Sequence, residues 1–443
     1  MRTQEKNNAL CVPSFNPWGR EVFFADFHVH SRFSRATSRE MDAAGLVMAA
    51  RRKGIGLVGT GDFTHPVYLE ELEGVLEPEG NGLYVHREDP EGPRFILTAE
   101  VSNIFTQGGK CRRIHTVLFA PDFWTAAEIQ NWLSKVGNIT SDGRPIFGFP
   151  VKDLVRVVME ISPRCLVVPA HVWTPWFSLF GAKSGFDSLE ECFEEESRHI
   201  CALETGLSSD PEMNWRLSAL DRYTLLSNSD AHSPGKIGRE ANVFSCALSY
   251  DAVMNAVRDP SKGFEGTIEF FPEEGKYHFD GHRACGVSLP PSETRQLGGR
   301  CPVCGGELTV GVLHRVEDLA DRPEGFRPPH ALPAVHLVPL DEIIAEAAGV
   351  KSQTSRVRKE YGRLVGIAGN EMEILLRMEE KELARFVPGK VLAGIRRMRA
   401  GSVHVVPGSD GTYGRVRLFA DGDDPQESPL NLSAHQGQLN LFD

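Results

Sequence analysis

The stretch ADFHVHSRFS, residues 25–34, closes the first apolar run of the sequence with two histidines that flank one valine. Alternate side chains of a β-strand point to the same face, so His28 and His30 are expected to project together. Two imidazoles at this spacing suit a metal ion better than they suit packing. The stretch matters for the fold because its pattern, an apolar run that carries a polar side chain near its end, recurs along the chain.

Seven such runs occupy the first 275 residues. They are VFFADFHVH (22–30), GIGLVGTGD (54–62), RFILTAEV (94–101), RRIHTVLFAP (112–121), CLVVPAH (165–171), ICALETG (200–206) and YTLLSNSD (223–230). Amphipathic stretches such as REMDAAGLVMAARRKG separate them and predict helices. Apolar strands that alternate with helices predict a parallel α/β fold, either open or closed into a barrel.

Each run carries or precedes a potential metal ligand. In chain order these ligands are His28, His30, Asp62, Glu100, His115, His171, Glu204, Asp230 and His232. A single one of them is as well explained as a satisfied buried polar group. Because β/α barrels build their active sites at the carboxyl ends of the strands, seven runs of this kind favour a shared metal site.

The number of ligands exceeds what one ion needs and indicates two or three metals, with a carboxylate such as Glu100 as a bridge. Zinc is expected in this site, and Mg²⁺ or Mn²⁺ is an alternative for catalysis. Paired metals stabilise the attacking and leaving oxygens of a phosphate ester, so the set predicts hydrolysis of a phosphoester by metal-activated water.

The motifs HVH, the downstream glutamate, two single histidines on later strands and SDAH (229–232) together resemble the polymerase and histidinol phosphatase (PHP) family of metal phosphoesterases. The resemblance covers about residues 20–275 and implies a distorted seven-stranded β/α barrel. It also implies that His28, His30, Glu100 and Asp230 hold one metal and form the catalytic set. By the same resemblance Glu100, His115 and His171 would hold a second metal, and His232 would help to hold a third.

Two departures from that family concern the third metal. Ala36 stands where many relatives have a further ligand, six residues after the second histidine of the first motif. The segment TGDFTHP (60–66) separates Asp62 from His65, whereas many relatives have the two residue types side by side. Asp62 and His65 are still candidate ligands. Glu204 is either a ligand or a residue that supports the ligands.

A second cluster lies in residues 276–322, where HRAC (282–285) and CPVC (301–304) bring together His282, Cys285, Cys301 and Cys304. This H-x2-C…C-x2-C spacing predicts a closed structural zinc site. His278 competes with His282 for the histidine position. A redox-active cysteine pair is the alternative.

Residues 323–420 are expected to form a basic helical domain after a proline-rich linker (323–339), with a hairpin around Gly408–Gly411. The whole chain has a net charge of −12, but residues 351–399 contain 12 Lys and Arg against 6 Asp and Glu. A basic segment in an acidic chain is compatible with contacts to DNA phosphates. The candidates are Lys351, Arg356, Arg358, Lys359 and Arg363, and a solvated helical face is the alternative.

The tail, residues 421–443, is polar and is expected to be disordered, but it ends in QLNLF. The QLNLF segment resembles the short peptides that dock into bacterial sliding clamps. The matching positions are Gln438, Leu439, Leu441 and Phe442. A tail that folds back onto its own domain is the alternative.

An aromatic loop follows His171 and includes Trp173, Trp176 and Phe177. These rings are candidates for stacking on an extruded base. Packing within the loop is an equally good explanation.

The order of barrel, zinc knuckle, basic helices and clamp-like tail resembles the endonuclease Q family of DNA repair enzymes. The motifs that carry this resemblance include ADFHVHSRFSRAT, KYHFDGHRACGVSL and CPVCGGELTVGVLHRVEDLAD. It implies a nick 5′ to deaminated bases (uracil, hypoxanthine or xanthine), and also at abasic sites, in double-stranded DNA. A small-molecule phosphatase of the histidinol-phosphatase kind and a non-catalytic scaffold at the clamp are the alternatives.

The composition places further bounds on the protein. The sequence contains no run of about 18 apolar residues, so it predicts no membrane span. The start of the sequence lacks the apolar core of a signal peptide. Most of the nine cysteines are isolated in apolar runs, as expected for reduced core residues. We therefore expect a cytoplasmic, monomeric protein.

Overall fold

The seven apolar runs all form β-strands. The computed structural model describes residues 17–19 and 21–419 of the chain. The strands are β1 (Phe23–Asp26), β2 (Ile55–Gly59), β5 (Arg94–Gln107), β6 (Lys110–Ala120), β8 (Leu166–Pro169), β9 (Ala202–Glu204) and β10 (Thr224–Leu226). The polar ends that the sequence predicted therefore follow strands in most cases, but Glu100 and His115 lie inside the long strands β5 and β6.

The main sheet has eleven strands in the order β15-β12-β11-β1-β2-β5-β4-β3, with β6 joined to β5 and β8, and β7 joined to β5. Its further members are β3 (Leu76–Pro78), β4 (Tyr84–His86), β7 (Ile146–Phe147), β11 (Ala241–Phe244), β12 (Phe264–Glu269) and β15 (Ala334–His336). The pairs β1–β2 and β2–β5 are parallel, whereas β1–β11, β5–β6 and β6–β8 are antiparallel. The α/β class is confirmed, and the sheet is mixed.

The expectation of parallel strands is wrong for β5 and β6, which form one long antiparallel hairpin. The physical reason is the turn at Gly108 and Gly109, whose φ angles of +61° and +73° are readily adopted by glycine and allow a two-residue connection. In the described residues β9 and β10 pair with each other in a separate two-stranded sheet. These strand pairings do not confirm a closed seven-stranded barrel. The barrel therefore stays a prediction.

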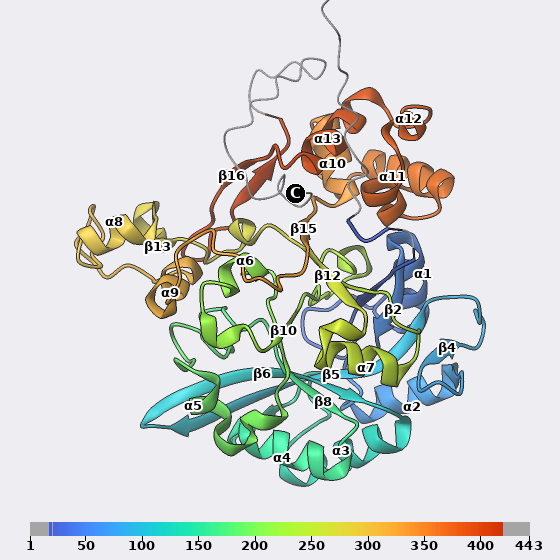
Figure 1. The fold of residues 1–443 in the computed structure, drawn as a ribbon, viewed down its shortest axis with the longest axis vertical. Coiled ribbons are helices and arrows are strands. Elements are labelled where there is room, and N and C mark those ends of the chain that lie inside the picture. The colour runs from blue at the N-terminus through green and yellow to red at the C-terminus, as the bar shows by residue number, and fades with distance from the viewer. Residues whose placement is uncertain (1–16, 20, 420–443) are drawn as a thin grey trace, which may run out of the picture.

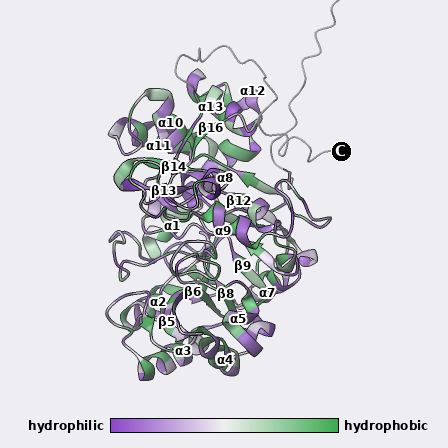
Figure 2. Ribbon diagram, turned by 90° about the vertical axis from the view of Figure 1, so that its left-hand side faces the viewer, coloured by the Kyte–Doolittle hydropathy of each residue, from purple (hydrophilic) through white to green (hydrophobic). Residues whose placement is uncertain are grey.

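Helices cover the sheet of the first 275 residues. They are α1 (Ala43–Lys53), α2 (Pro66–Val75), α3 (Phe123–Val136), α4 (Val151–Ile161), α5 (Leu189–Phe193), α6 (Pro211–Asn214) and α7 (Tyr250–Arg258). In Figure 1, α3 and α4 lie below the long strands β5 and β6. The apolar face of α4 buries Leu154, Val155 and Val158, each worth roughly 1.5–3 kcal/mol. Figure 2 shows hydrophilic and hydrophobic residues side by side along these outer helices, as expected for amphipathic elements.

The C-terminal region is helical, as predicted. It contains α10 (Leu340–Ala348), α11 (Ser355–Ala368), a π-helical turn (Glu373–Arg377), α12 (Glu380–Leu383) and α13 (Gly389–Arg399). The predicted hairpin is confirmed as β16 (His404–Val406) paired with β17 (Arg415–Arg417). The predicted linker ends in β15, which adds a parallel edge strand to β12 of the main sheet.

The helical region lies next to the start of the chain, with α11 close to α1 (Figure 1), and buried polar contacts join the two. Lys53, the last residue of α1, lies 2.6 Å from Glu371, and both side chains are buried. Tyr361 of α11 donates to the same carboxylate, and Arg377 donates to the carbonyl of Val22. Within the described ranges, no helix combines the length and the apolar character that a membrane span requires.

Candidate metal centre

Four side chains from distant parts of the chain form the first ligand group. The Oε2 atom of Glu100 lies 3.4 Å from Nε2 of His28 and 3.1 Å from Nε2 of His30. The Oδ1 atom of Asp230 lies 3.0 Å from Nε2 of His30 and 3.7 Å from Nε2 of His28. All the facing ligand atoms of this group lie within 4.8 Å of one another.

A second group uses the other oxygen of the same glutamate. The Oε1 atom of Glu100 lies 2.6 Å from Nδ1 of His115 and 3.2 Å from Nε2 of His171, and these two nitrogens are 3.3 Å apart. Glu100 therefore stands between two groups and presents one oxygen to each. The structure brings together the same residues that the family resemblance assigned to two metals.

The sheet explains why Glu100 and His115 meet. In the β5–β6 hairpin, Glu100 is opposite Val117 and Ser102 is opposite His115. Because side chains two residues apart share a face, Glu100 and His115 are diagonal neighbours on one face of the sheet. The register of the hairpin therefore positions both side chains, and no loop conformation is required to bring them together.

Two further ligands, His171 and Asp230, and the neighbouring Asp62 lie in loops that are held in unusual backbone conformations. Asp62, His171 and Asp230 have φ angles of +47°, +30° and +47°. Such angles are uncommon outside glycine and cluster at functional sites, where the surrounding structure holds them. At Gly206, a side chain is excluded because its Cβ would lie 2.5 Å from Cβ of His171.

The buried polar atoms of the first group fit divalent cations. Within the described residues, Nε2 of His28, Nε2 of His30 and Oδ1 of Asp230 are buried and make no hydrogen bond. An unsatisfied buried polar group costs roughly 1–3 kcal/mol. A cation between the imidazoles and the carboxylates would satisfy all three atoms, and this mixed nitrogen and oxygen set suits zinc or manganese.

Electrostatics of the centre are dominated by these close contacts. Burial alone would lower the pKa of His28, but the carboxylates of Glu204 and Glu100 raise it well above its usual value. Burial likewise opposes the charge of Asp230, but His30 and His28 lower its pKa. Burial lowers the pKa of His115 to about 4, so this imidazole is neutral and able to act as a ligand at neutral pH.

Glu204 and Asp62 stand behind the ligands and are absent from both groups. Glu204 lies 3.0 Å from Nδ1 of His28 and accepts a hydrogen bond from the backbone N–H of His171. Asp62 lies 3.2 Å from Nδ1 of His30 and accepts from the backbone N–H of Ser31. Carboxylates in this position fix the orientation of ligating histidines. The geometry therefore favours the supporting role for Glu204 and gives Asp62 the same role.

His65 and His232 do not assemble a third ligand group in the described part of the chain. Nε2 of His65 lies 3.3 Å from the carbonyl of Thr140, and its ring stacks on Phe33. The ring of His232 lies 4.4 Å from that of His30, at the edge of the first group. Ala36 is exposed on a loop with a φ angle of +61°.

Arg144 belongs to the centre, although no motif in the sequence marks it. Its Nη1 atom donates to Oε2 of Glu100 at 3.0 Å. The residue lies in the loop between α3 and β7, far in sequence from every motif that carries a ligand. No spacing or composition signal marks it, because its place depends on how that loop packs.

The four predicted zinc ligands also come together. His282, Cys285, Cys301 and Cys304 offer ligand atoms within 4.8 Å of one another. They lie around β13 (Asp280–His282), β14 (Val287–Leu289) and the turn before α9 (Val312–Leu319), beside α8 (Pro291–Gln296). His278 is buried apart from this group, next to Phe279. The geometry therefore favours His282 as the fourth member.

The turn that follows CPVC prepares its two cysteines for a metal. Gly305 has a φ angle of +72°, and the N–H of Gly306 points to the sulfur of Cys304 at 3.4 Å. Desolvation raises the pKa of Cys301, but backbone N–H groups outweigh this effect and lower it to about 7. A thiolate is thus accessible at neutral pH, as zinc binding requires.

The aromatic loop is only partly available to a base. Trp173 is fully buried, and its Nε1 donates to Asn214, so the prediction that it stacks on a base is wrong. Trp176 is 37% exposed and meets Tyr277 edge to face. Phe177 lies 4.7 Å from the ring of His115, at the rim of the metal centre.

The predicted DNA-contacting cations lie on or next to α11 and are exposed, namely Lys351, Arg356, Arg358, Lys359 and Arg363. Arg363 is engaged with Glu360 and with the carbonyl of Phe386. The other four form no ion pair within the described residues and are available for an external anion. Gln438, Leu439, Leu441 and Phe442 of the clamp-like motif lie outside the described residues.

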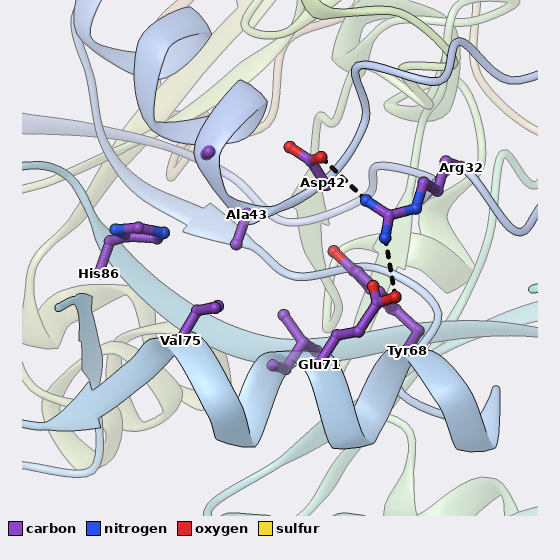
Figure 3. Close-up of a pocket in the computed structure, with 9 residues that line it drawn as sticks. Arg32, Asp42, Ala43, Tyr68, Glu71, Val75 and His86 are labelled. Atoms are coloured by element: carbon purple, nitrogen blue, oxygen red, sulfur yellow. Dashed lines mark hydrogen bonds and ion pairs between the residues drawn. The ribbon is translucent and has the colours of Figure 1, made fainter. Parts of the chain in front are cut away.

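A surface pocket between α1 and α2 is separate from this chemistry (Figure 3). Arg32 points into it and donates to Asp42 and Glu71, so its charge is already compensated. None of the residues that line the pocket belongs to either ligand group of the metal centre.

Comparisons with known proteins give matches along almost the whole chain. The Bacillus subtilis protein YqxK is 33% identical over 413 residues, which are 89% of this chain and 99% of that protein. The Methanocaldococcus jannaschii protein MJ0043 is 31% identical over 258 residues, which are 56% of this chain but 31% of that longer protein. The family model of the MJ0043 C-terminal domain matches residues 339–402.

Solved structures with a similar fold include the lesion-specific endonuclease PfuEndoQ from Pyrococcus furiosus. It has a TM-score of 0.80 and 29% identity, and the match covers 95% of this chain and 99% of that one. An endonuclease Q bound to a 27-mer duplex with an abasic lesion at its active site has a TM-score of 0.81 and 29% identity, over 93% of this chain and 100% of that one.

Proposed function

We infer the activity of this chain from two matches: it belongs to the family of the Bacillus subtilis protein YqxK and has the fold of endonuclease Q, and it is a metal-dependent DNA endonuclease. We propose that it repairs DNA by nicking the strand 5′ to deaminated bases (uracil, hypoxanthine and xanthine) and at abasic sites. The observation that carries this proposal is the pair of ligand groups that share Glu100, in a chain that matches endonuclease Q over more than nine tenths of its length.

The residues of the chain prepare the centre for phosphodiester hydrolysis. Bound divalent metals would lower the pKa of water and stabilise the charge that develops on the phosphate. Glu100 holds the two groups at a fixed separation because it presents one oxygen to each. Glu204 and Asp62 keep the Nε2 atoms of His28 and His30 directed into the centre. We assign zinc to this centre and keep Mg²⁺ or Mn²⁺ as the alternative for catalysis.

Recognition of DNA is assigned to surfaces outside the centre. Lys351, Arg356, Arg358 and Lys359, which form no ion pair within the described residues, would contact phosphates, and such contacts position a duplex without reading its sequence. Trp176 and Phe177 lie at the rim and would stack on a lesion that swings out of the helix. The knuckle of His282, Cys285, Cys301 and Cys304 would hold a structural zinc. A cytoplasmic monomer is the form in which we expect the enzyme to act.

The QLNLF tail supports a second proposed partner, the bacterial sliding clamp. A chain that lacks residues 438–443 should lose binding to the clamp in a pull-down with purified components and should nick short free duplexes at the normal rate. Equal clamp binding by the full and the shortened chain would remove this partner from the account.

The experiment that tests the function is a nicking assay on end-labelled duplexes. Each duplex carries one uracil, hypoxanthine, xanthine, abasic site or normal base, and the length of the product maps the cut. We expect cuts 5′ to the lesions and none in the normal duplex. Release of phosphate from small monoesters without nicking would favour a small-molecule phosphatase. Clamp binding without either activity would favour a scaffold.

A further inference from the structure

The loop 138–145, between α3 and β7, is fastened onto the metal centre. The N–H of Gly143 donates to the carbonyl of Phe33, and Thr64 donates to the carbonyl of Gly143. A Cβ at position 143 would lie 2.3 Å from Oδ2 of Asp62 and 2.5 Å from Oγ of Ser34. This close approach requires glycine, so the loop is built to lie against the segments that carry Asp62 and His30.

These contacts put the loop where a third metal would need its ligands. Ala36 provides no ligand atom, and the Nε2 atom of His65 faces the carbonyl of Thr140 in the loop itself. The described residues around this place do not fit a third cation. The loop instead directs a cationic side chain, that of Arg144, at Glu100 of the metal centre.

Arg144 has the geometry of a phosphate-binding residue. Its guanidinium has five N–H donors. One nitrogen donates to Oε2 of Glu100 at 3.0 Å, and the guanidinium makes no other hydrogen bond within the described residues. The side chain is 29% exposed, so it is open to the solvent side of the centre. The end of the loop is attached to β5, because the carbonyl of Pro145 accepts a hydrogen bond from the N–H of Ser102.

We propose that Arg144 is a catalytic residue that binds a non-bridging oxygen of the scissile phosphate and supplies the positive charge that a third metal would otherwise bring. Its contact with Glu100 places the guanidinium within hydrogen-bond distance of a residue shared by both ligand groups. Arginine forms strong, directional hydrogen bonds to phosphate oxygens, and such charge stabilises a transition state in which those oxygens gain negative charge. This inference rests on the proposed function, because it takes the substrate to be a phosphodiester of DNA.

The test measures how tightly the metal-loaded enzyme binds two lesion duplexes that it cannot cut. In the first, a methylene group replaces the leaving oxygen of the scissile linkage, so the phosphonate keeps its negative charge. In the second, a methylphosphonate removes that charge. Fluorescence anisotropy gives the Kd of each duplex. We expect the wild-type enzyme to prefer the charged duplex by roughly tenfold, the lower range for a hydrogen bond to a charged group.

The preference of R144M for the charged duplex should be several-fold smaller than that of the wild type, because only the contribution of the bound metals remains. R144K should keep part of the difference because it keeps the charge. R156M, which removes an exposed arginine on α4, is the matched control and should behave as wild type. Metal content and thermal melting are measured for each variant to show that the centre is intact.

The outcomes separate this inference from the proposed function. A preference in R144M equal to that of the wild type, or no preference in the wild type, would overturn the role of Arg144. A lower metal content in R144M together with an unchanged preference would show that Arg144 only balances the charge of Glu100. Failure of the wild type to nick any lesion duplex would instead overturn the proposed function, since that assay does not depend on Arg144 variants.

Discussion

The metal centre and the zinc knuckle share only histidine among their ligand types and are built in opposite ways: the centre adds carboxylates and the knuckle adds cysteines. Ligands of the metal centre come from residues 28 to 230, are mostly buried, and are oriented by further carboxylates. Those of the knuckle come from residues 282 to 304, and Cys304 is exposed. The first site is therefore held by the fold and remains in place to do chemistry, whereas the second site needs its metal to hold the local chain together.

The largest effect is expected for Asp230→Asn, which removes a carboxylate of the first ligand group and keeps its shape. Nicking of a uracil duplex should fall by at least about 10³-fold, because charge on a ligand controls both metal binding and the reaction. DNA binding should be unchanged. A single-turnover nicking assay and an anisotropy titration measure the two quantities.

Asp251→Asn on the exposed surface of α7 is the control and should nick normally. Nicking by Asp230→Asn at the wild-type rate would remove the metal centre from the mechanism and would leave the knuckle as the only metal site to consider.

A smaller loss is expected for Glu204→Gln, because Glu204 acts through His28 and the backbone of His171. Changes to residues that orient metal ligands commonly reduce metal affinity or activity by about 10–100-fold. The nicking rate should fall within that range and recover in part when excess metal is added. The exposed Glu195→Gln is the matched control. A loss as large as that of Asp230→Asn, with no recovery, would make Glu204 a ligand instead.

The knuckle is tested with Cys301→Ser. Loss of one ligand should release one metal per chain and open residues 282–310 to limited proteolysis, because few apolar side chains are buried there. Nicking should fall by no more than about tenfold, a change of about 1.4 kcal/mol. Cys111→Ser, an exposed isolated cysteine, should change neither quantity. Complete loss of nicking with normal metal in the centre would show that the two sites are not separate in function.

The smallest effect is the pH dependence of stability that comes from the buried carboxyl group of Glu269. Burial raises the pKa of Glu269 from its ordinary value of 4.5 to about 8. The folded state therefore binds more protons than the unfolded state between these values, and stability falls as the pH rises from 4.5 to 8. The slope from this one group is at most about 1.4 kcal/mol per pH unit.

Glu269→Gln should flatten that dependence when the free energy of unfolding is measured by urea titration at several pH values, and the exposed Glu160→Gln should not. An unchanged slope would show that Glu269 ionises freely in the folded protein. Neither variant should alter the metal content of the knuckle, because neither residue belongs to its ligand group.

The sequence predicted much of the metal centre because its ligands are side chains of rare types at the ends of apolar runs. His28 and His30 are an example: they follow β1 on either side of Val29, which forms an isolated bridge with Ala231, and two imidazoles at this spacing have few other uses. The hairpin of β5 and β6 was also within reach, because Gly108 and Gly109 form a recognisable two-residue turn between two apolar runs. The apolar composition of these runs favours parallel strands, whereas the two-glycine turn indicates an antiparallel hairpin.

Other features depend on tertiary packing that no local pattern records. Arg144 reaches Glu100 because Gly143 lets its loop lie against Asp62, and neither residue stands in a motif. Trp173 and Trp176 are three residues apart in one aromatic loop, yet one is fully buried and the other is 37% exposed. The sequence describes both rings alike, and only the packing of the loop distinguishes them.

The central claim is that the groups around Glu100 hold the metals that cut DNA. It is tested most directly by adding metal back to chelated enzyme while metal per chain and nicking of a uracil duplex are measured together. We expect one metal to enter the knuckle without restoring activity, as the same titration of Cys301→Ser would reveal by its missing equivalent. Nicking should return only as two further metals bind. Full nicking with a single metal per chain would contradict the account.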